Sequence, residues 1–412
     1  MSPAHIAAAD PGPTLNALLA QAKAARRYDI GFPGATDLAH PELGDWLTGQ
    51  LLNNIGDPWD PGHGRNHTKT LEQQVVDMVG DLLRAPQGRW GYVTGGSSEG
   101  TEHALDEAWQ AFHGEVVVYT SQAAHYSVVK AARRLKLPIV IVRADTAGRM
   151  DVDDLAGQLS LRRERAAMIV ATAGTTMTEA VDDVAAIAQV CDELAVVRRR
   201  IHVDAALSGI PLALLPARQR PAFDFAAGAT SMVISGHKFL STLMPCGVLV
   251  YVDSPYNTAG GRVTYTGSAD TTISGSRSGH TPLILWSVFT RLGTEGLRAR
   301  AQAARELATY TYHEITKLGW PASLNPHAFT VVLDTPPPQI RDKWVLADDG
   351  RRAHIVCMPG VTAGQIDEFV TDLREAMRSP HIAWPVRQRT ASAAAAPARR
   401  HVAPATPERQ VA

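Results

Sequence analysis

A lysine and an aspartate stand at the ends of two apolar runs, where they could act together on a bound cofactor. Lys238 closes the segment Ser235-Gly236-His237-Lys238, and Asp204 ends the predicted strand 201–204. The lysine amine could form a Schiff base with an aldehyde, and the aspartate could hold a proton on a ring nitrogen. The pair is typical of a pyridoxal phosphate site, whose protonated ring accepts electrons.

Each residue also has an ordinary interpretation. A lone lysine at a strand end is usually a solvated surface residue, and a lone aspartate there usually caps a helix or forms a turn. The assignment therefore depends on further elements that follow in a fixed order.

A glycine- and serine-rich turn precedes both residues. Gly95-Gly96-Ser97-Ser98 stands between a short apolar run and the helical pattern 102–112. Backbone N–H groups at a helix start, with small hydroxyls beside them, can bind a phosphate. The spacing matches neither a Walker A loop nor GxGxxG, so it indicates neither a nucleoside triphosphate nor a dinucleotide. A plain turn with a serine N-cap is the alternative for this segment.

Two more segments carry side chains that could reach the same place. His125 follows the predicted strand 116–119, where its imidazole could stack on a planar cofactor or simply face solvent at a helix start. Gly174-Thr175-Thr176 follows the predicted strand 168–171, and its hydroxyls could line the cleft or only terminate the strand.

In this order the segments resemble the group II pyridoxal-phosphate-dependent amino-acid decarboxylases. The similarity is greatest to the bacterial histidine decarboxylase branch, which plant serine decarboxylases also resemble, and it covers roughly residues 50–375. The motifs that carry it are Gly91-Tyr92-Val93-Thr94, Ser98-Glu99-Gly100, His125-Tyr126-Ser127-Val128, Gly174-Thr175-Thr176, Val181-Asp182-Asp183, His202-Val203-Asp204-Ala205-Ala206-Leu207-Ser208-Gly209, Ser235-Gly236-His237-Lys238, Pro245-Cys246-Gly247 and Gly275-Ser276-Arg277-Ser278-Gly279-His280-Thr281-Pro282-Leu283.

The resemblance implies a role for each matching position. Lys238 is implied to form the Schiff base with pyridoxal 5′-phosphate, and Asp204 to pair with the pyridine nitrogen. His125 is implied to stack on one face of the ring, and Ala206 to pack against the other. Contacts to the phosphate or to the lysine side of the cofactor are implied for Ser97, Ser98, Ser235 and His237.

One departure from the family concerns the phosphate turn. The family usually reads Thr-Asn-Gly-Gly-Thr-Glu-Gly-Asn, whereas this chain reads Thr94-Gly95-Gly96-Ser97-Ser98-Glu99-Gly100-Thr101. Both asparagine amides are replaced, which leaves the backbone cradle intact but leaves the details of phosphate contact and substrate preference open.

The segment 265–280 supplies two further candidates. The family uses a loop tyrosine to protonate the substrate carbon, and Tyr265 is the candidate here, with a packed or surface aromatic as the alternative. The resemblance also implies a homodimer with active sites at its interface. The polar loop at Ser276 and Arg277 is then expected to complete the phosphate pocket of the neighbouring chain.

The expected activity is decarboxylation of an L-amino acid to an amine and carbon dioxide, with histidine as the first substrate considered. Two alternative substrates are serine and an aliphatic amino acid such as valine. The alternative reaction within enzymes is another pyridoxal-dependent cleavage of a carbon–carbon bond. A cofactor-binding relative that acts as a partner or regulator is the alternative from another class, and the presence of both Lys238 and Asp204 weighs against it.

Composition narrows the function classes. The 412-residue chain has a formal net charge of −1, which indicates neither nucleic-acid nor membrane binding. The chain contains no run of about eighteen apolar residues, so no membrane span is predicted. The start of the chain lacks the basic and apolar parts of a signal peptide, and its three cysteines form neither a metal pattern nor an even disulfide set. These features predict a cytoplasmic protein without a metal site, and richness in alanine and arginine is typical of a bacterial source.

Alternating strands and helices must position these residues. Continuous apolar strands between helices predict an α/β fold with a mostly parallel sheet buried on both faces. Ligand sites on such sheets lie at the carboxyl ends of the strands. The predicted strands are 116–119, 139–142, 168–171, 201–204, 232–235 and 247–252, and the predicted helices are 66–83, 126–135, 151–160 and 184–194.

The chain is expected to divide into four parts, and the resemblance implies the fold-type I, aspartate aminotransferase-like architecture. Residues 1–55, with a helix over 15–26, form a segment expected to pack on the partner, and 56–294 form the large cofactor-binding domain. Residues 295–386 form a small α/β domain with strands at 329–333 and 354–358 and a helix over 363–377. Residues 387–412 are rich in alanine, proline and arginine and are expected to be disordered.

Overall fold

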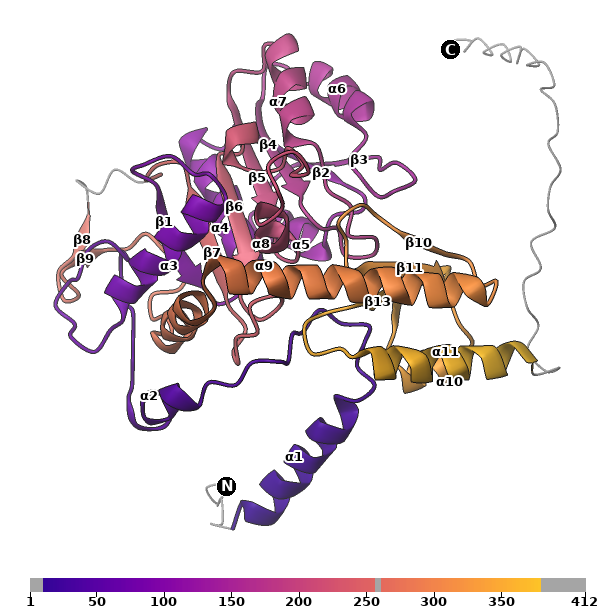
Figure 1. The fold of residues 1–412 in the computed structure, drawn as a ribbon. Coiled ribbons are helices and arrows are strands. Elements are labelled where there is room, and N and C mark those ends of the chain that lie inside the picture. The colour runs from indigo at the N-terminus through magenta and orange to yellow at the C-terminus, as the bar shows by residue number, and fades with distance from the viewer. Residues whose placement is uncertain (1–9, 256–260, 379–412) are drawn as a thin grey trace, which may run out of the picture.

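A seven-stranded sheet forms the centre of the molecule in the computed structural model, which describes residues 10–255 and 261–378 (Figure 1). Its strand order is β1-β7-β6-β5-β4-β2-β3. Only β7 runs antiparallel to its neighbours, so the predicted mostly parallel sheet is confirmed. The strands are β1 (Trp90–Thr94), β2 (Val116–Ser121), β3 (Ile139–Val142), β4 (Ala166–Thr172), β5 (Arg199–Asp204), β6 (Ser231–Ser235) and β7 (Gly247–Tyr251).

The central strands are buried on both faces because successive side chains enter two different cores. In β2, Val117 and Tyr119 belong to one apolar cluster, while Val116 and Val118 belong to the other. The edge strand β3 departs from this expectation, since Ile141 is 47% exposed. The helices around the sheet are α3 (Lys69–Leu82), α4 (Ser97–Ala111), α5 (Tyr126–Arg134), α6 (Val152–Ser160), α7 (Val184–Glu193) and the short α8 (Gly209–Ala213).

A second, antiparallel sheet follows in the C-terminal part. Its order is β10-β11-β13-β12, and the strands are β10 (Ala322–Leu324), β11 (Thr330–Asp334), β12 (Ala347–Asp348) and β13 (Arg352–Val356). The long helix α9 (His280–Lys317) connects the two sheets and breaks at Gly293, whose φ of 56° suits glycine. The remaining elements there are α10 (Pro338–Lys343) and α11 (Ala363–Arg378).

The N-terminal segment divides between an exposed helix and an extended strap, which comprises residues 29–40. Helix α1 (Gly12–Ala25) buries none of its residues and extends away from the body (Figure 1). Beyond it, the amide of Ala35 donates to the carbonyl of Lys238 at 3.3 Å, and that of Thr36 donates to the carbonyl of Pro359 at 3.0 Å. This strap therefore packs on its own chain, between the two sheets, and packing on a partner stays a prediction for α1.

The other boundaries stay predictions as well. The proposed division after residue 294 falls within α9, and the tail 387–412 lies outside the described residues. The short elements are α2 (Gly44–Gly49), the 3-10 helices η1 (Pro41–Leu43) and η2 (Phe225–Ala227), and the two-stranded ribbon of β8 (Arg262–Val263) and β9 (Ser268–Ala269). Among the described residues, no helix combines the length and the apolar character that crossing a bilayer requires.

Candidate active site

One cavity of about 570 Å³ lies at the carboxyl ends of the parallel strands and collects most of the predicted site residues. Strands β4, β5 and β6 end at this cavity, and helix α4 begins there. The predicted residues that line it are Ser97, Ser98, His125, Asp204, Ala206, Ser235, His237 and Lys238.

Lys238 and Asp204 reach the cavity from neighbouring strands. Asp204 is the last residue of β5 and lies beside Val233 of β6, and Lys238 follows the end of β6. Burial lowers the pKa of Lys238 below its ordinary value, and the nearby Asp204 raises it. No salt bridge joins the two side chains within the described residues, so both side chains remain available to a molecule bound in the cavity.

Asp204 is buried, and a backbone amide two residues later holds its carboxylate. Its Oδ1 accepts a hydrogen bond from the amide of Ala206 at 3.2 Å, which places the Ala206 methyl group at the same cavity. Thr172 lies beside Asp204 in the sheet register, and its buried hydroxyl has no partner among the described residues. A buried hydroxyl at a cavity wall is ready to bond a polar ligand atom.

His125 is held as a flat, neutral ring. It caps α5, and its Nδ1 accepts from the amide of Ser127 at 3.3 Å and lies 2.8 Å from the Ser127 hydroxyl. Burial lowers its pKa, Asp204 raises it and Lys238 lowers it further, with a net lowering. Because Nδ1 acts as an acceptor, the neutral ring carries its proton on Nε2.

His237 is anchored to the start of β7. Its Nδ1 accepts from the amide of Cys246 at 3.2 Å, and burial lowers its pKa. The imidazole beside Lys238 is thus fixed in orientation and neutral in its resting form.

The glycine- and serine-rich turn also lines the Lys238 cavity, through Gly96, Ser97 and Ser98. Helix α4 begins at Ser97, and the N-cap residue offers no side-chain hydrogen bond to it. The N–H groups of its first turn are therefore not capped by a side chain of that residue. The hydroxyls of Ser97 and Ser235 lie 2.6 Å apart and join this turn to the strand that leads to Lys238. Free N–H groups beside two hydroxyls suit an anion such as a phosphate.

Several lining residues come from parts that the sequence did not connect with the site. Phe32 and Pro33 enter from the N-terminal strap, and His354 enters from β13. The His354 ring joins the strap to the body, with Nε2 3.0 Å from the carbonyl of Gly31 and Nδ1 3.3 Å from that of Met177. The Gly-Phe-Pro-Gly run at 31–34 marks an irregular segment, whereas no local signal singles out His354.

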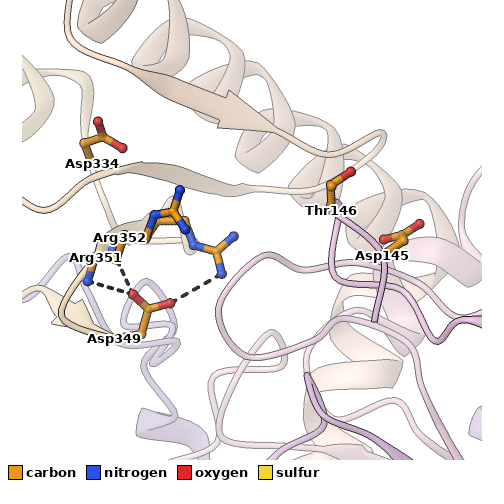
Figure 2. A pocket seen from close by; sticks show the side chains of 6 residues that line it. All are labelled: Asp145, Thr146, Asp334, Asp349, Arg351 and Arg352. Carbon is orange, nitrogen blue, oxygen red and sulfur yellow. Dashed lines mark hydrogen bonds and ion pairs between the residues drawn. The ribbon is translucent and has the colours of Figure 1, made fainter. Parts of the chain in front are cut away.

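A second hollow of about 600 Å³ lies between the loop at Asp145 and the ends of the second sheet (Figure 2). The carboxylate of Asp349 accepts hydrogen bonds from the amides of Arg351 and Arg352 at 3.0 and 2.7 Å, and it pairs with the Arg352 guanidinium at 3.4 Å. The lining of this hollow contains no lysine that could form a Schiff base, so it does not suit the chemistry predicted for Lys238. The lining residues are Asp145, Thr146, Asp334, Asp349, Arg351 and Arg352.

Two predicted site residues do not reach the Lys238 cavity of their own chain. Tyr265 is 84% exposed and borders a separate hollow of about 170 Å³ with Asn53 and Lys69. Ser276 is exposed and accepts a hydrogen bond from Nδ2 of Asn53 at 3.2 Å. Both belong to residues 261–279, which contact α3 and β1 through Arg277, and neither lines the Lys238 cavity.

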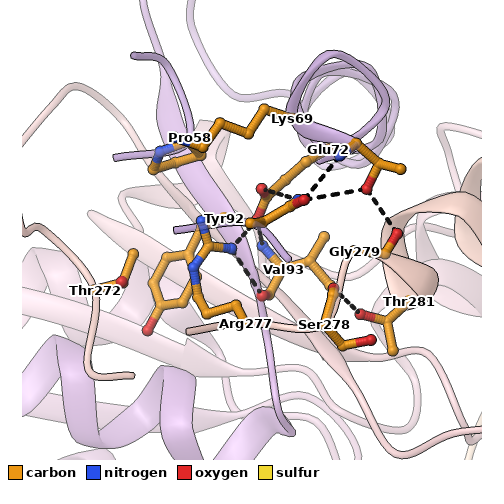
Figure 3. Close-up of polar contacts among 12 residues, drawn as sticks. Pro58, Lys69, Glu72, Tyr92, Val93, Thr272, Arg277, Ser278, Gly279 and Thr281 are labelled. Atoms are coloured by element: carbon orange, nitrogen blue, oxygen red, sulfur yellow. Dashed lines mark hydrogen bonds and ion pairs between the residues drawn. The ribbon is translucent and has the colours of Figure 1, made fainter. Parts of the chain in front are cut away.

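Arg277, expected to serve a neighbouring chain, makes its contacts within its own chain in the structure (Figure 3). Its side chain is buried and forms an ion pair with the buried Glu72. It also donates to the carbonyl of Gly56 at 3.2 Å and lies 5.2 Å from the centre of the Tyr92 ring. These contacts hold the terminal guanidinium nitrogens of Arg277 inside its own chain.

Comparisons with known proteins agree with this geometry. A family model described as the pyridoxal-dependent decarboxylase conserved domain matches residues 32–322. A histidine decarboxylase of Mesorhizobium japonicum is 40% identical over 359 residues, which are 86% of this chain and 95% of that protein. Serine decarboxylase 1 of Oryza sativa subsp. japonica is 33% identical over 353 residues, 85% of this chain and 72% of that protein.

Solved structures match at lower identity and show the fold alone. The L-methionine decarboxylase from Streptomyces sp. 590 superposes with a TM-score of 0.80 at 24% identity, covering 89% of this chain and 95% of that one. A Lactobacillus brevis glutamate decarboxylase superposes with a TM-score of 0.74 at 18% identity, covering 92% and 95%.

Proposed function

Since the chain belongs to the pyridoxal-dependent decarboxylase family and is a pyridoxal-phosphate-dependent amino-acid decarboxylase, we propose that the Lys238 cavity is its active site and L-histidine its substrate. That membership confirms three predictions: the family resemblance of the motifs, the fold class and the cofactor. The observation that carries the site assignment is the meeting of Lys238, Asp204 and His125 in one cavity.

The lining residues fit pyridoxal phosphate. The uncapped start of α4 and the Ser97 and Ser235 hydroxyls suit its phosphate, and the unpartnered Thr172 hydroxyl suits a polar ring substituent. When bound, the cofactor supplies a ring that accepts the electron pair left on the substrate carbon when carbon dioxide departs. Lys238 offers the amine that binds the cofactor's aldehyde.

The other side chains prepare the site for that chemistry. Asp204, which is buried, would hold a proton at the ring nitrogen and keep the ring electron-poor. His125 and Ala206 restrict the ring to one plane, so that the bond to be broken is aligned with the ring's π-system. The neutral form of His125 allows a flat contact without a competing charge.

Histidine is the substrate favoured by similarity, because a histidine decarboxylase shares 40% identity over nearly the whole of both chains. Serine is the second candidate, since serine decarboxylases match at 33% identity over most of this chain. A screen of the twenty amino acids for amine and carbon dioxide release tests the choice, with Lys238→Ala as the blank. Histamine as the main product supports the proposal, and release of a different amine overturns the substrate.

We further infer a cytoplasmic homodimer in which Tyr265 serves the neighbouring cavity as the proton donor to the substrate carbon, and Ser276 contacts the neighbouring phosphate. Three observations support this: the exposure of Tyr265, its place at a hollow other than the Lys238 cavity, and the exposed Leu15 and Leu18 on α1. All three cysteines are buried and unpaired, which suits a reducing compartment.

Mixed dimers test the shared site. Lys238→Ala and Tyr265→Phe chains are each expected to be inactive as pure dimers. A hybrid of the two regains one intact site only if Tyr265 acts across the interface. Partial activity in purified hybrids supports the arrangement, and inactive hybrids or a fully active monomer contradict it.

A further inference from the structure

Glu99 makes two contacts that fix the turn ahead of α4. Its Oε2 accepts a hydrogen bond from the amide of Gly95 at 2.8 Å, and its Oε1 accepts one from the Tyr92 hydroxyl at 3.1 Å. Gly95 stands in the turn and Tyr92 in β1, so one carboxylate binds the turn to the sheet.

The position of Glu99 leaves the start of the helix open to a ligand. Glu99 is the third residue of α4, where a glutamate commonly bonds back to the N-cap amide. Here it bonds to the residue before the N-cap, and the N-cap Gly96 has no side chain with which to cap the helix. The turn is thus held by Glu99 while the amides of Ser97 and Ser98 stay free of a side-chain cap.

The Tyr92 hydroxyl is itself held firmly. Its ring is fully buried and lies 5.2 Å from the guanidinium carbon of Arg277, which is paired with Glu72 (Figure 3). The buried ion pair, the ring and the carboxylate form a continuous set of contacts from α3 to the glycine turn. Two consecutive glycines give this turn little stiffness of its own, so its shape depends on that support.

We propose that Glu99 is a positioning residue that presets the Gly95–Gly96 turn for the cofactor's phosphate, with Tyr92 as its support. This inference rests on the proposed phosphate site at Ser97 and Ser98. Glu99 is not among the residues that line the Lys238 cavity, so it acts by fixing the turn that leads to the Ser97 and Ser98 amides.

Pyridoxal, which has the ring and aldehyde but no phosphate, separates this role from a general effect on folding. Dissociation constants for pyridoxal phosphate and for pyridoxal are measured on the apoprotein by tryptophan fluorescence. Glu99→Ala is expected to weaken pyridoxal phosphate binding about tenfold, because a charge-assisted hydrogen bond is lost, while pyridoxal binding stays unchanged. Glu99→Gln keeps an acceptor for Gly95 and a donor toward Tyr92, so it is expected to stay within about twofold of the parent.

Two matched variants complete the experiment. Asp106→Ala removes a carboxylate from the same helix that, among the described residues, accepts a hydrogen bond only from Gln110, and it should leave both constants unchanged. Tyr92→Phe removes one of the two Glu99 contacts and should give an intermediate loss for pyridoxal phosphate alone.

The outcomes distinguish the inference from the site on which it rests. The positioning role is overturned if Glu99→Ala weakens the binding of pyridoxal phosphate and pyridoxal equally. It is also overturned if Glu99→Ala and Glu99→Gln both bind pyridoxal phosphate more tightly than the parent. If Ser97→Ala weakens pyridoxal phosphate selectively while Glu99→Ala does not, the phosphate site stands and only this inference fails. If neither variant affects phosphate selectivity, the phosphate site is misplaced.

Discussion

The side-chain oxygens of Ser97 and Ser235 lie 2.6 Å apart, although one residue opens helix α4 and the other ends strand β6. This contact joins the glycine turn to the strand that leads to Lys238. Any group bound at the start of α4 is thereby placed at a fixed position relative to the lysine.

Replacing Ser235 by alanine should weaken cofactor binding. The change removes one hydroxyl from the proposed phosphate site and leaves the buried Ser97 hydroxyl without this partner, which costs about 1–3 kcal/mol. We expect the dissociation constant for pyridoxal phosphate to rise roughly tenfold. Titration of the apoprotein measures it, and unchanged affinity would place the phosphate elsewhere.

Lys238→Ala should abolish turnover, because this amine attaches the cofactor and exchanges with the substrate amine. Borohydride reduction of the parent protein followed by peptide mapping should label Lys238. A label on Lys130 or Lys69 instead would contradict the assignment of the site.

Asp204→Ala should lower kcat by several orders of magnitude, since a ring without a held proton is a poor electron acceptor. Asp204→Glu keeps the charge and should retain part of the activity. Cofactor absorbance controls for occupancy in both variants. Near-normal turnover of Asp204→Ala would mean that another group protonates the ring nitrogen.

Arg277→Ala should destabilise the fold itself. The change leaves Glu72 buried without its charge partner, and such losses cost about 3–5 kcal/mol. Urea denaturation measures the change, with Arg149→Ala as a control because its pair with Asp145 is largely exposed. If Arg277→Ala is as stable as the control, Arg277 is not the structural residue that its contacts indicate.

The buried Glu179 should make stability fall as the pH rises from about 4.5 to about 7. Burial raises its pKa from 4.5 to about 7, against hydrogen bonds from Thr330, Ser208 and the amide of Phe329. The unfolded chain releases this proton near pH 4.5, whereas the folded chain keeps it until about 7. Folding therefore loses up to about 3 kcal/mol across that interval.

Denaturation curves between pH 4.5 and 8 measure this slope. Glu179→Gln cannot ionise, and its amide can still accept from Phe329 and donate to Ser208. The variant should therefore show a flatter profile than the parent. An equal slope in both proteins would assign the pH dependence to another buried group such as Asp182, whose pKa burial raises to about 6.

The sequence alone determined the chemistry and most of the sheet. Lys238, Asp204 and His125 were found because each stands next to the end of an apolar run, and parallel strands bring such ends to one edge. Strand positions differed by only one or two residues, as for the predicted 168–171 and the observed β4 (Ala166–Thr172). Local periodicity carries this information because it depends on neighbours along the chain.

Tertiary structure alone decided which distant segments meet at the cavity and which do not. It brought Phe32 and His354 to the cavity, kept Tyr265 and Ser276 away from it, and buried Arg277 against Glu72, which lies 205 positions earlier in the chain. These outcomes depend on how α9 and the N-terminal strap pack across the two sheets. No local pattern specifies that packing, because the contacts that stabilise it join residues far apart in the sequence.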